Sequence, residues 1–264
     1  MYYVLSLQNK QRKSSSICPF VSEQVIDTLP AKSTGEHVYV EFRHERIAKN
    51  EMICRSQAFY QFMNQRRTLR FFSTDPVPIE VIQNCVLTAG TAPSGAHCQP
   101  WTFVIVKDKI IKTQLREVIE NEERVNYDHR MNSDWIKDLG PLMGTLHVEN
   151  EIVKPYIEEA PYIIIVLKQQ YGLKNGKRIA HYYPMESVCI ATGILLTAIH
   201  NANLVSLVST PMGAENAIRS LCNRPDNERV LFFMPVGYPA DNATVPYRND
   251  EYLRKSIEDI LYIV

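Results

Sequence analysis

Residues 162–168 read YIIIVLK, and this stretch decides the class of fold. An unbroken run rich in β-branched residues is typical of a strand whose two faces are both covered by other elements. Similar runs at 101–107 (WTFVIVK) and 230–236 (VLFFMPV), with a further one at 204–210, predict three further strands. The chain therefore contains the strands of one buried central sheet.

Helical patterns separate these strands. The spacing of apolar residues predicts helices over 52–66, from Pro78 to Leu87, over 110–130, over 184–202 and over 214–222. Residues 131–155 are mixed, and we expect Gly140-Pro141 and Gly144 to interrupt any long helix there; residues 172–176 are expected to form a turn. The order predicts an α+β fold with a central sheet wrapped by helices, in one domain over 51–264.

The N-terminal residues 1–50 lack a sustained hydrophobic period and are interpreted as a poorly ordered or extended arm. The whole chain of 264 residues has 29 basic and 29 acidic side chains, so its formal net charge is zero. This balance disfavours nucleic-acid binding through bulk charge, and the composition excludes a disordered, collagen-like or disulfide-scaffold protein.

The six cysteines form no C-x-x-C pair, and Cys85 and Cys189 lie within apolar helical patterns, where a thiol behaves as a small hydrophobe. This pattern favours a reducing compartment. The first residues are too short an apolar run for a signal peptide, and residues 188–199 are too short to cross a membrane. We expect a soluble, cytoplasmic chain.

The first candidate for chemistry is Arg66-Arg-Thr-Leu-Arg70, expected at the end of a helix, where Arg66 and Arg70 share a face and Arg67 points elsewhere. Guanidinium groups suit phosphate or carboxylate, but cations are also common in the solvated last turn of a helix. The loop from Pro93 to His97 is the second candidate, since Gly95 permits close approach of a ligand; a tight connecting turn is the alternative.

Glu123 and Tyr127 are four residues apart on the long predicted helix and therefore share a face, with Lys154 further along the chain. A carboxylate, a phenol and an ammonium group together suit an amino acid zwitterion, although the surrounding acidic run also fits a solvated face. Ser209 and Thr210 follow a predicted strand and either contact a ligand or cap the next helix.

Several other chemistries lack support in the sequence. The seven histidines and the cysteines show no metal-ligand spacing, and no G-x-S-x-G elbow or nucleotide-binding glycine motif occurs. An arginine cluster without a nucleotide motif leaves the phosphate of a bound cofactor as the economical hypothesis.

Six motifs occur in order along the chain: R-R-T-L-R-F at 66–71, T-A-P-S-G-A-H-x-x-P-W-T-F-V at 91–104, E-x-x-x-Y at 123–127, H-Y-Y at 181–183, S-T-P at 209–211 and P-V-G-Y-P at 235–239. The set resembles the nitroreductase superfamily of FMN proteins and, within it, the deiodinase branch, the reductive dehalogenases of halotyrosines. The resemblance covers about Arg46 to the C-terminus. It implies a central mixed sheet wrapped by helices and an FMN site at a homodimer interface.

The resemblance implies a role for each candidate residue. FMN would be bound by Arg66, Arg67, Thr68, Leu69, Arg70, Pro93, Ser94, Gly95, Val208, Ser209, Thr210 and Arg254, with Arg248 as the alternative to Arg254. The substrate would be bound by Ala96, Glu123, Tyr127 and Lys154. The catalytic residue would be Thr210, whose hydroxyl would lie near the flavin N5.

The activity that the resemblance implies is conversion of 3-iodotyrosine and 3,5-diiodotyrosine to tyrosine and iodide. The electrons would come ultimately from NADPH through a reductase partner. Family members are often membrane-anchored by an N-terminal segment that is not visible here. Two alternatives stay open: a broad-range FMN nitro- or quinone reductase, and a non-catalytic regulatory subunit that binds a membrane protein.

Overall fold

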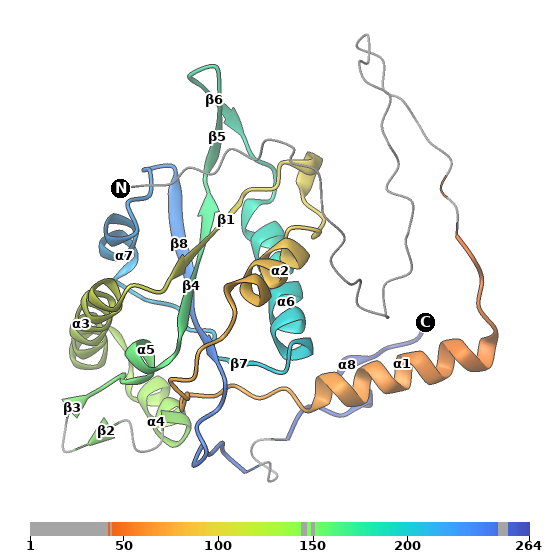
Figure 1. The fold of residues 1–264 in the computed structure, drawn as a ribbon, viewed down its shortest axis with the longest axis horizontal. Helices are drawn as coiled ribbons and strands as arrows, with labels where there is room; N and C mark the ends of the chain where they lie inside the picture. The colour runs from red at the N-terminus through yellow and green to blue at the C-terminus, as the bar shows by residue number, and fades with distance from the viewer. Residues whose placement is uncertain (1–41, 43, 144–146, 149–150, 248–252) are drawn as a thin grey trace. The chain divides into compact units, whose positions relative to one another are not determined.

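Four strands form one antiparallel sheet in the computed structural model, which describes residues 42, 44–143, 147–148, 151–247 and 253–264. Across the sheet the order is β1 (Trp101–Val106), β4 (Tyr162–Gln169), β8 (Glu228–Gly237) and β7 (Val205–Ser206) (Figure 1). In β4, Ile164 pairs with Ile105 of β1, and Ile165 pairs with Phe233 of β8. The stretch that decides the fold is therefore an inner strand.

Alternate side chains of β4 enter two separate cores, as the two-residue period of a strand requires. Ile163, Ile165 and Leu167 pack into one core, whereas Tyr162, Ile164 and Val166 pack into the other. The first core is closed by α3 (Lys109–Val125), α5 (Tyr156–Glu159) and α7 (Glu215–Leu221), and the second by α2 (Ile79–Ala89) and α6 (Pro184–Asn201) (Figure 1). The prediction of a sheet covered on both faces is confirmed.

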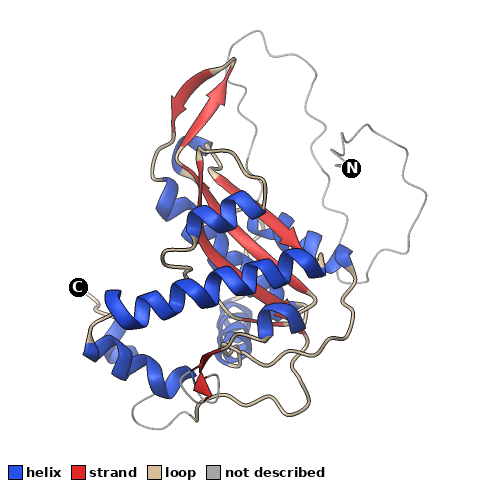
Figure 2. Cartoon of the chain, turned by 90° about the vertical axis from the view of Figure 1, so that its left-hand side faces the viewer, coloured by secondary structure: helices blue, strands red, loops and turns tan. Residues whose placement is uncertain are grey.

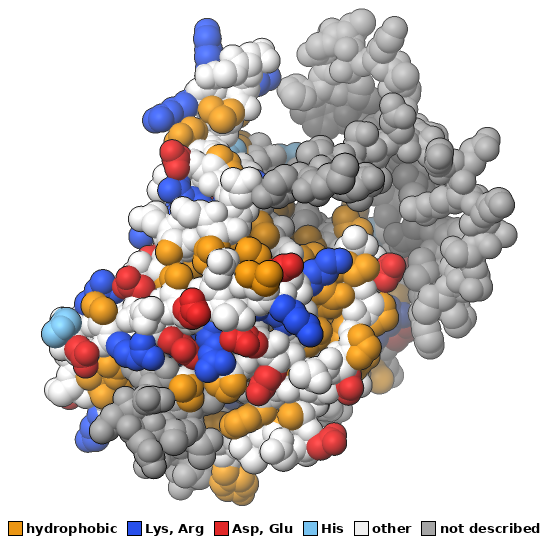
Figure 3. All heavy atoms as spheres, turned by 60° about the vertical axis from the view of Figure 1, so that its left-hand side comes forward, with side chains coloured by type: hydrophobic (Ala, Val, Ile, Leu, Met, Phe, Trp, Pro, Cys, Tyr) orange, Lys and Arg blue, Asp and Glu red, His pale blue; other side chains and the backbone are white. Residues whose placement is uncertain are grey.

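The remaining elements lie around this three-layer centre. They are α1 (Lys49–Asn64), α4 (Ser133–Met143), α8 (Ile257–Ile260), a 3-10 turn η1 (Gly95–His97), a π-helical turn η2 (Asn126–Arg130) and the short strands β2 (His147–Val148), β3 (Glu151–Ile152), β5 (Tyr171–Lys174) and β6 (Lys177–Ala180). Figure 2 shows the β5–β6 hairpin projecting beyond the main sheet. On the face in Figure 3, acidic and basic side chains are interspersed, in keeping with the zero net charge.

The expectation of a mixed sheet is wrong for the described strands, because every pairing within the four-stranded sheet is antiparallel. Burial on both faces shows that helices cover a strand, but it carries no information on the direction of its neighbours. Parallel pairing among the described residues is confined to an isolated bridge between Thr68 and Ser206.

Three local predictions also change. The strand expected over 204–210 is paired with β8 only at Val205–Ser206, followed by an isolated bridge at Ser209. The turn expected over 172–176 is a hairpin whose Asn175 and Gly176 both have positive φ, as a tight two-residue turn requires. Helix α4 continues through Gly140-Pro141 and ends at Met143, so the expected interruption falls in its last turn.

The predictions on the remaining features have different outcomes. Cys85 is buried as expected, but Cys189 is exposed on α6. The arm expected over residues 1–50 lies almost entirely outside the described residues, as does Arg248. Within the part of the chain that the structure describes, no helix combines the length and apolar character needed to cross a membrane.

Candidate active site

The predicted substrate residues Glu123 and Tyr127 lie where α3 passes into the π-helical turn. α3 ends at Val125, so Tyr127 belongs to η2 rather than to a continuous α-helix. Burial raises the pKa of the Tyr127 phenol and the Glu123 carboxylate adds to this rise, while the cations of Lys154 and Arg70 oppose it. The phenol therefore stays protonated and able to donate a hydrogen bond, with all three charged groups as its neighbours.

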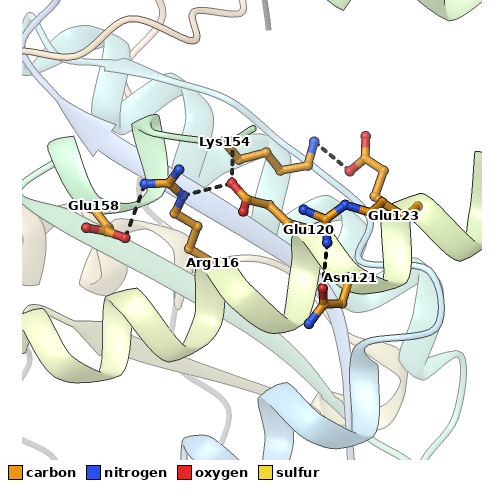
Figure 4. Close-up of polar contacts among 7 residues, drawn as sticks. Arg116, Glu120, Asn121, Glu123, Lys154 and Glu158 are labelled. Carbon is orange, nitrogen blue, oxygen red and sulfur yellow. Dashed lines mark hydrogen bonds and ion pairs between the residues drawn. The ribbon is translucent and has the colours of Figure 1, made fainter. Parts of the chain in front are cut away.

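Lys154 reaches the same place from the segment before α5. Its Nζ lies 2.5 Å from Oε2 of Glu123, and the two side chains are only 3% and 18% exposed. The ammonium also lies 5.8 Å from the centre of the Tyr156 ring. Charges buried to this degree need a partner of opposite sign, and Glu123 and Lys154 supply this to each other (Figure 4).

A cavity of about 500 Å³ brings several predicted residues together. Its lining includes Arg70, Glu123, Lys154, Val208, Ser209 and Thr210. Within the described part of the chain, the Arg70 guanidinium makes no hydrogen bond or ion pair, and Thr210 is exposed. The cavity therefore offers an unpaired cation and a free hydroxyl beside a buried pair of opposite charges.

The arginine segment is positioned differently from the sequence expectation. Helix α1 ends at Asn64, so residues 66–70 are not helical; the Leu69 N–H instead donates to the Ser206 carbonyl at 3.3 Å, beside the Thr68–Ser206 bridge. Arg66 and Arg67 line a smaller cavity of about 270 Å³ near the end of α6, whereas Arg70 lines the larger one. The expectation that Arg66 and Arg70 share a helical face is wrong, because the chain between them is not helical.

Arg254 meets this segment from the C-terminal part of the chain. Its guanidinium donates to Oδ1 of Asn64 at 2.6 Å and to the carbonyl of Arg66 at 3.0 Å. Arg67 in turn donates to the Pro246 carbonyl. The structure thus brings Arg254 beside Arg66 and Arg67, the two predicted phosphate contacts that lie far from it in sequence.

The loop from Pro93 to Ala96 is shaped by contacts with the start of α6. The Gly95 N–H donates to Oγ of Ser187 at 3.4 Å, and a Cβ on Gly95 would lie 2.4 Å from the Tyr182 carbonyl oxygen, so only glycine fits. Ser94 Oγ accepts the N–H of Gln99 at 2.9 Å. Ala96 has a φ of 48°, a left-handed conformation that is disfavoured for residues with a Cβ and often occurs at functional sites.

This loop and the arginine segment lie at opposite ends of α6. Gly95 contacts Ser187 in the first turn, whereas His200 in the last turn lines the cavity with Arg66 and Arg67. These two helix positions are thirteen residues apart, or about 20 Å along the axis. One chain therefore does not bring Pro93–Ala96 together with Arg66 and Arg67.

Sequence reasoning missed the side chains that complete the cavity. Trp135 and Leu139 of α4, together with Met131 and Met212, line it. Asn126 Nδ2 donates to the Met212 carbonyl at 2.8 Å and so joins η2 to the residues after Thr210. Met131, Trp135 and Leu139 lie in the mixed region 131–155 and Met212 lies in the loop after Thr210, and neither segment carries a motif that indicates a cavity.

Comparisons with known proteins agree with this fold. The model of the nitroreductase family matches residues 63–238, which include the sheet, the cavity and most of the predicted site. The chain belongs to the nitroreductase family.

Its relatives define the branch within that family. The chain is 46% identical over 242 residues to iodotyrosine deiodinase of Nematostella vectensis, covering 90% of this chain and 88% of the relative. It is 42% identical over 253 residues to iodotyrosine deiodinase 1 of Homo sapiens, covering 96% and 83%. A crystal structure of oxidized iodotyrosine deiodinase bound to FMN and 3-iodo-L-tyrosine matches with a TM-score of 0.60 and 30% identity, over 75% of this chain and 98% of that one. Within the nitroreductase family, the chain is grouped with the iodotyrosine deiodinases.

Proposed function

We propose that this protein is an FMN-dependent iodotyrosine deiodinase, which converts 3-iodotyrosine and 3,5-diiodotyrosine to tyrosine and iodide. The observation that carries the proposal is the cavity in which the buried Glu123–Lys154 pair lies with Arg70 and Thr210. A generic reductase of flat aromatic compounds has no need of two buried charges of opposite sign. A free amino acid does, because its ammonium and carboxylate must both be paired when they leave water.

Glu123, Tyr127 and Lys154, hereafter the zwitterion clamp, suit the two ends of the amino acid. The substrate ammonium is expected to face Glu123, while its carboxylate faces Lys154 and the protonated phenol of Tyr127. Because the substrate brings one charge of each sign, each member of the ion pair exchanges one partner for another and no buried charge is left alone. Selectivity for amino acids over simple phenols follows from this exchange.

The residues present fit a flavin with a phosphate group. Among the described residues, the Arg70 guanidinium in the cavity has no hydrogen-bond or ion-pair partner, and Arg66, Arg67 and Arg254 lie close together. Guanidinium groups match phosphate geometry. The residues that would hold FMN are Arg66, Arg67, Thr68, Leu69, Arg70, Val208, Ser209, Thr210 and Arg254 on one side, and Pro93, Ser94 and Gly95 on the other.

In the proposed reaction a carbon–iodine bond breaks, a carbon–hydrogen bond forms, and two electrons and one proton are consumed as iodide leaves. Reduced FMN supplies the two electrons when it is bound. The backbone N–H of Ala96 is expected to hold the phenolate oxygen, and the Thr210 hydroxyl to donate a hydrogen bond to the flavin. Trp135 and Leu139 cover the cavity and exclude water from it. The source of the electrons is an NADPH-linked reductase partner.

We further propose that the functional unit is a homodimer. The two ends of α6 lie about 20 Å apart, so the Pro93–Ala96 loop is distant from Arg66 and Arg67 of its own chain. A second copy of the chain would supply that loop to the site. A groove of about 590 Å³ between α1, α2 and α6, lined in part by Phe59 and Phe62, supports this proposal, since α1 has no buried residue. In a two-fold dimer the same faces of both copies are covered.

The deciding experiment mixes the dithionite-reduced holoprotein with 3-iodotyrosine under anaerobic conditions and follows both flavin oxidation and free iodide. We expect flavin oxidation with one iodide released per flavin. A protein that binds FMN and reduces nitroaromatic compounds, but releases no iodide, would instead be a general nitro- or quinone reductase. Bound FMN with neither activity would leave the regulatory subunit, with a membrane-protein partner.

A further inference from the structure

We propose that Glu120 is a positioning residue for the zwitterion clamp: it fixes the main chain of Lys154 and so sets the position of the Lys154 ammonium opposite Glu123. The proposal deepens the proposed function and rests on it, because it takes Glu123 and Lys154 as the groups that bind the amino acid. It assigns a task to a carboxylate that does not itself line the cavity.

The contacts of Glu120 link the helix to the clamp. The backbone N–H of Lys154 donates to Oε1 of Glu120 at 2.6 Å, and Nε of Arg116 donates to the same oxygen at 2.7 Å. Arg116 also donates to Oε1 of Glu158 at 3.4 Å (Figure 4). Glu120 is 8% exposed, so both bonds lie in a protected place where a charge-assisted hydrogen bond is strong.

Two carboxylates of α3 therefore hold one lysine at two points. Glu120 and Glu123 are three residues apart and project from the same face of the helix toward Lys154 (Figure 4). Glu120 accepts the main-chain N–H, and Glu123 accepts the side-chain ammonium. Both contacts come from the same helix. The main chain and the ammonium of Lys154 are therefore both held relative to Glu123.

The surroundings of Lys154 explain why such a support is needed. The residue lies between the two-residue strand β3 and the one-turn helix α5, so no long element holds its main chain. Its carbonyl accepts the Ile157 N–H at 3.1 Å, which fixes the side toward α5. Glu120 supplies the corresponding bond on the N-terminal side. Without it, the ammonium would keep its charge but lose its fixed position.

The charge of Glu120 is already balanced by Arg116, so this carboxylate is not a second site for the substrate ammonium. The expected effect of removing it is consequently indirect. Binding of the zwitterion should weaken, whereas the binding of FMN and of a halophenol without amino and carboxyl groups should not change. If Glu120 only stabilised the fold, its removal would weaken the binding of all three ligands to a similar degree.

The test compares three variants of the FMN holoprotein. Glu120→Met removes the acceptor oxygen at similar length, Glu120→Gln keeps an acceptor oxygen, and Glu117→Gln is the control on an exposed position of α3. The dissociation constants of 3-iodotyrosine, 2-iodophenol and FMN are measured by flavin fluorescence. We expect Glu120→Met to weaken 3-iodotyrosine binding about tenfold, because the Lys154 ammonium is no longer held in place and its contact with the substrate carboxylate is weakened, with most of the affinity kept in Glu120→Gln.

Amide hydrogen exchange of the Lys154 segment provides a second readout that needs no substrate. The Lys154 amide should exchange faster in Glu120→Met than in wild type and in the Glu117→Gln control. If Glu120→Met does not fold, Glu120→Asp keeps the charge beside Arg116 but cannot reach the amide, and the same two results are expected in weaker form.

The possible outcomes are distinct. An unchanged affinity for 3-iodotyrosine in a folded Glu120→Met protein, an equal loss for 2-iodophenol, or an unchanged Lys154 amide would each overturn the proposal. The proposed function fails separately, if Glu123→Gln binds 3-iodotyrosine as well as wild type does. In that case the amide exchange still decides whether Glu120 holds Lys154.

Discussion

At the scale of single residues, the main feature is a buried ion pair between Lys154 and Glu123. Lys154 is 3% exposed and is neutralised by Glu123 at 2.5 Å, while the buried Tyr156 ring lies beside its ammonium. The E-x-x-x-Y spacing already indicated that Glu123 and Tyr127 would lie together. It could not indicate Lys154, which is 31 residues from Glu123 and depends on the path of α4 and the short segments after it.

A prediction at the residue scale concerns Cys222, whose thiol packs against the core on the α3 side of the sheet. Burial raises the pKa of this thiol to about 11 from an ordinary value of 9.0. Since the folded state then holds the proton more tightly than the unfolded state, the contribution to stability is complete below pH 9 and is lost as the pH rises from 9 toward 11. Urea unfolding at pH 8 and pH 10.5 should therefore show a smaller loss of stability in Cys222→Ala than in wild type.

The exposed Cys54 provides the control for this experiment, because Cys54→Ala should lose stability with pH as wild type does. An equal pH dependence in wild type and Cys222→Ala would show that the thiol does not titrate in the folded protein at a shifted pKa.

At the scale of elements, helix α3 and the π-helical turn after it bring the predicted substrate residues together. Helix α3 presents Glu120 and Glu123 on one face and then changes to a π-helical turn that carries Tyr127. Such turns are rare and frequently occur at functional sites. The amphipathic pattern predicted the helix, but the widened turn depends on contacts such as that of Asn126 with the Met212 carbonyl, which are remote in sequence.

Helix α4 contributes Trp135 and Leu139 to the lining of the cavity, and Trp135 is the larger of the two. We predict that Trp135→Ala raises the KM for 3-iodotyrosine about fivefold, because removal of a partly exposed indole opens the cavity to water and forfeits about 1 kcal/mol of apolar contact. Steady-state kinetics would measure the change. Trp135→Phe should retain most of the affinity, and an unchanged KM in Trp135→Ala would show that α4 does not cover the bound substrate.

At the scale of the whole molecule, the predicted cofactor residues fall into two groups that one chain keeps apart. Arg66, Arg67 and Arg254 lie toward the C-terminal end of α6, and the Pro93–Ala96 loop lies at its N-terminal end. This separation, together with the exposed apolar side chains of α1, supports the proposed homodimer.

The dimer proposal predicts complementation between two inactive chains. Gly95→Val disrupts the loop, because even a Cβ would lie 2.4 Å from the Tyr182 carbonyl oxygen, and Arg70→Ala removes the unpaired cation. Each homodimer should lack deiodinase activity. A heterodimer of the two variants, purified with two different tags, contains one site that combines the unaltered Arg70 of one chain with the unaltered Gly95 loop of the other. It should recover about half of the wild-type activity, since one of two symmetric sites is intact. No recovery in a folded heterodimer would indicate that each site is formed by a single chain.

Three features could be predicted from the sequence: the central strand at 162–168 with both faces buried, the order and position of most helices, and the motifs of the family. These are local properties, set by the period of apolar residues and by short-range geometry. The antiparallel direction of the sheet, the non-helical path of Arg66–Arg70, the pairing of Lys154 with Glu123 and the hydrogen bond from Lys154 to Glu120 became visible only in three dimensions. These features depend on contacts between segments remote in sequence, and their positions are fixed by packing around the sheet rather than by the residues beside them.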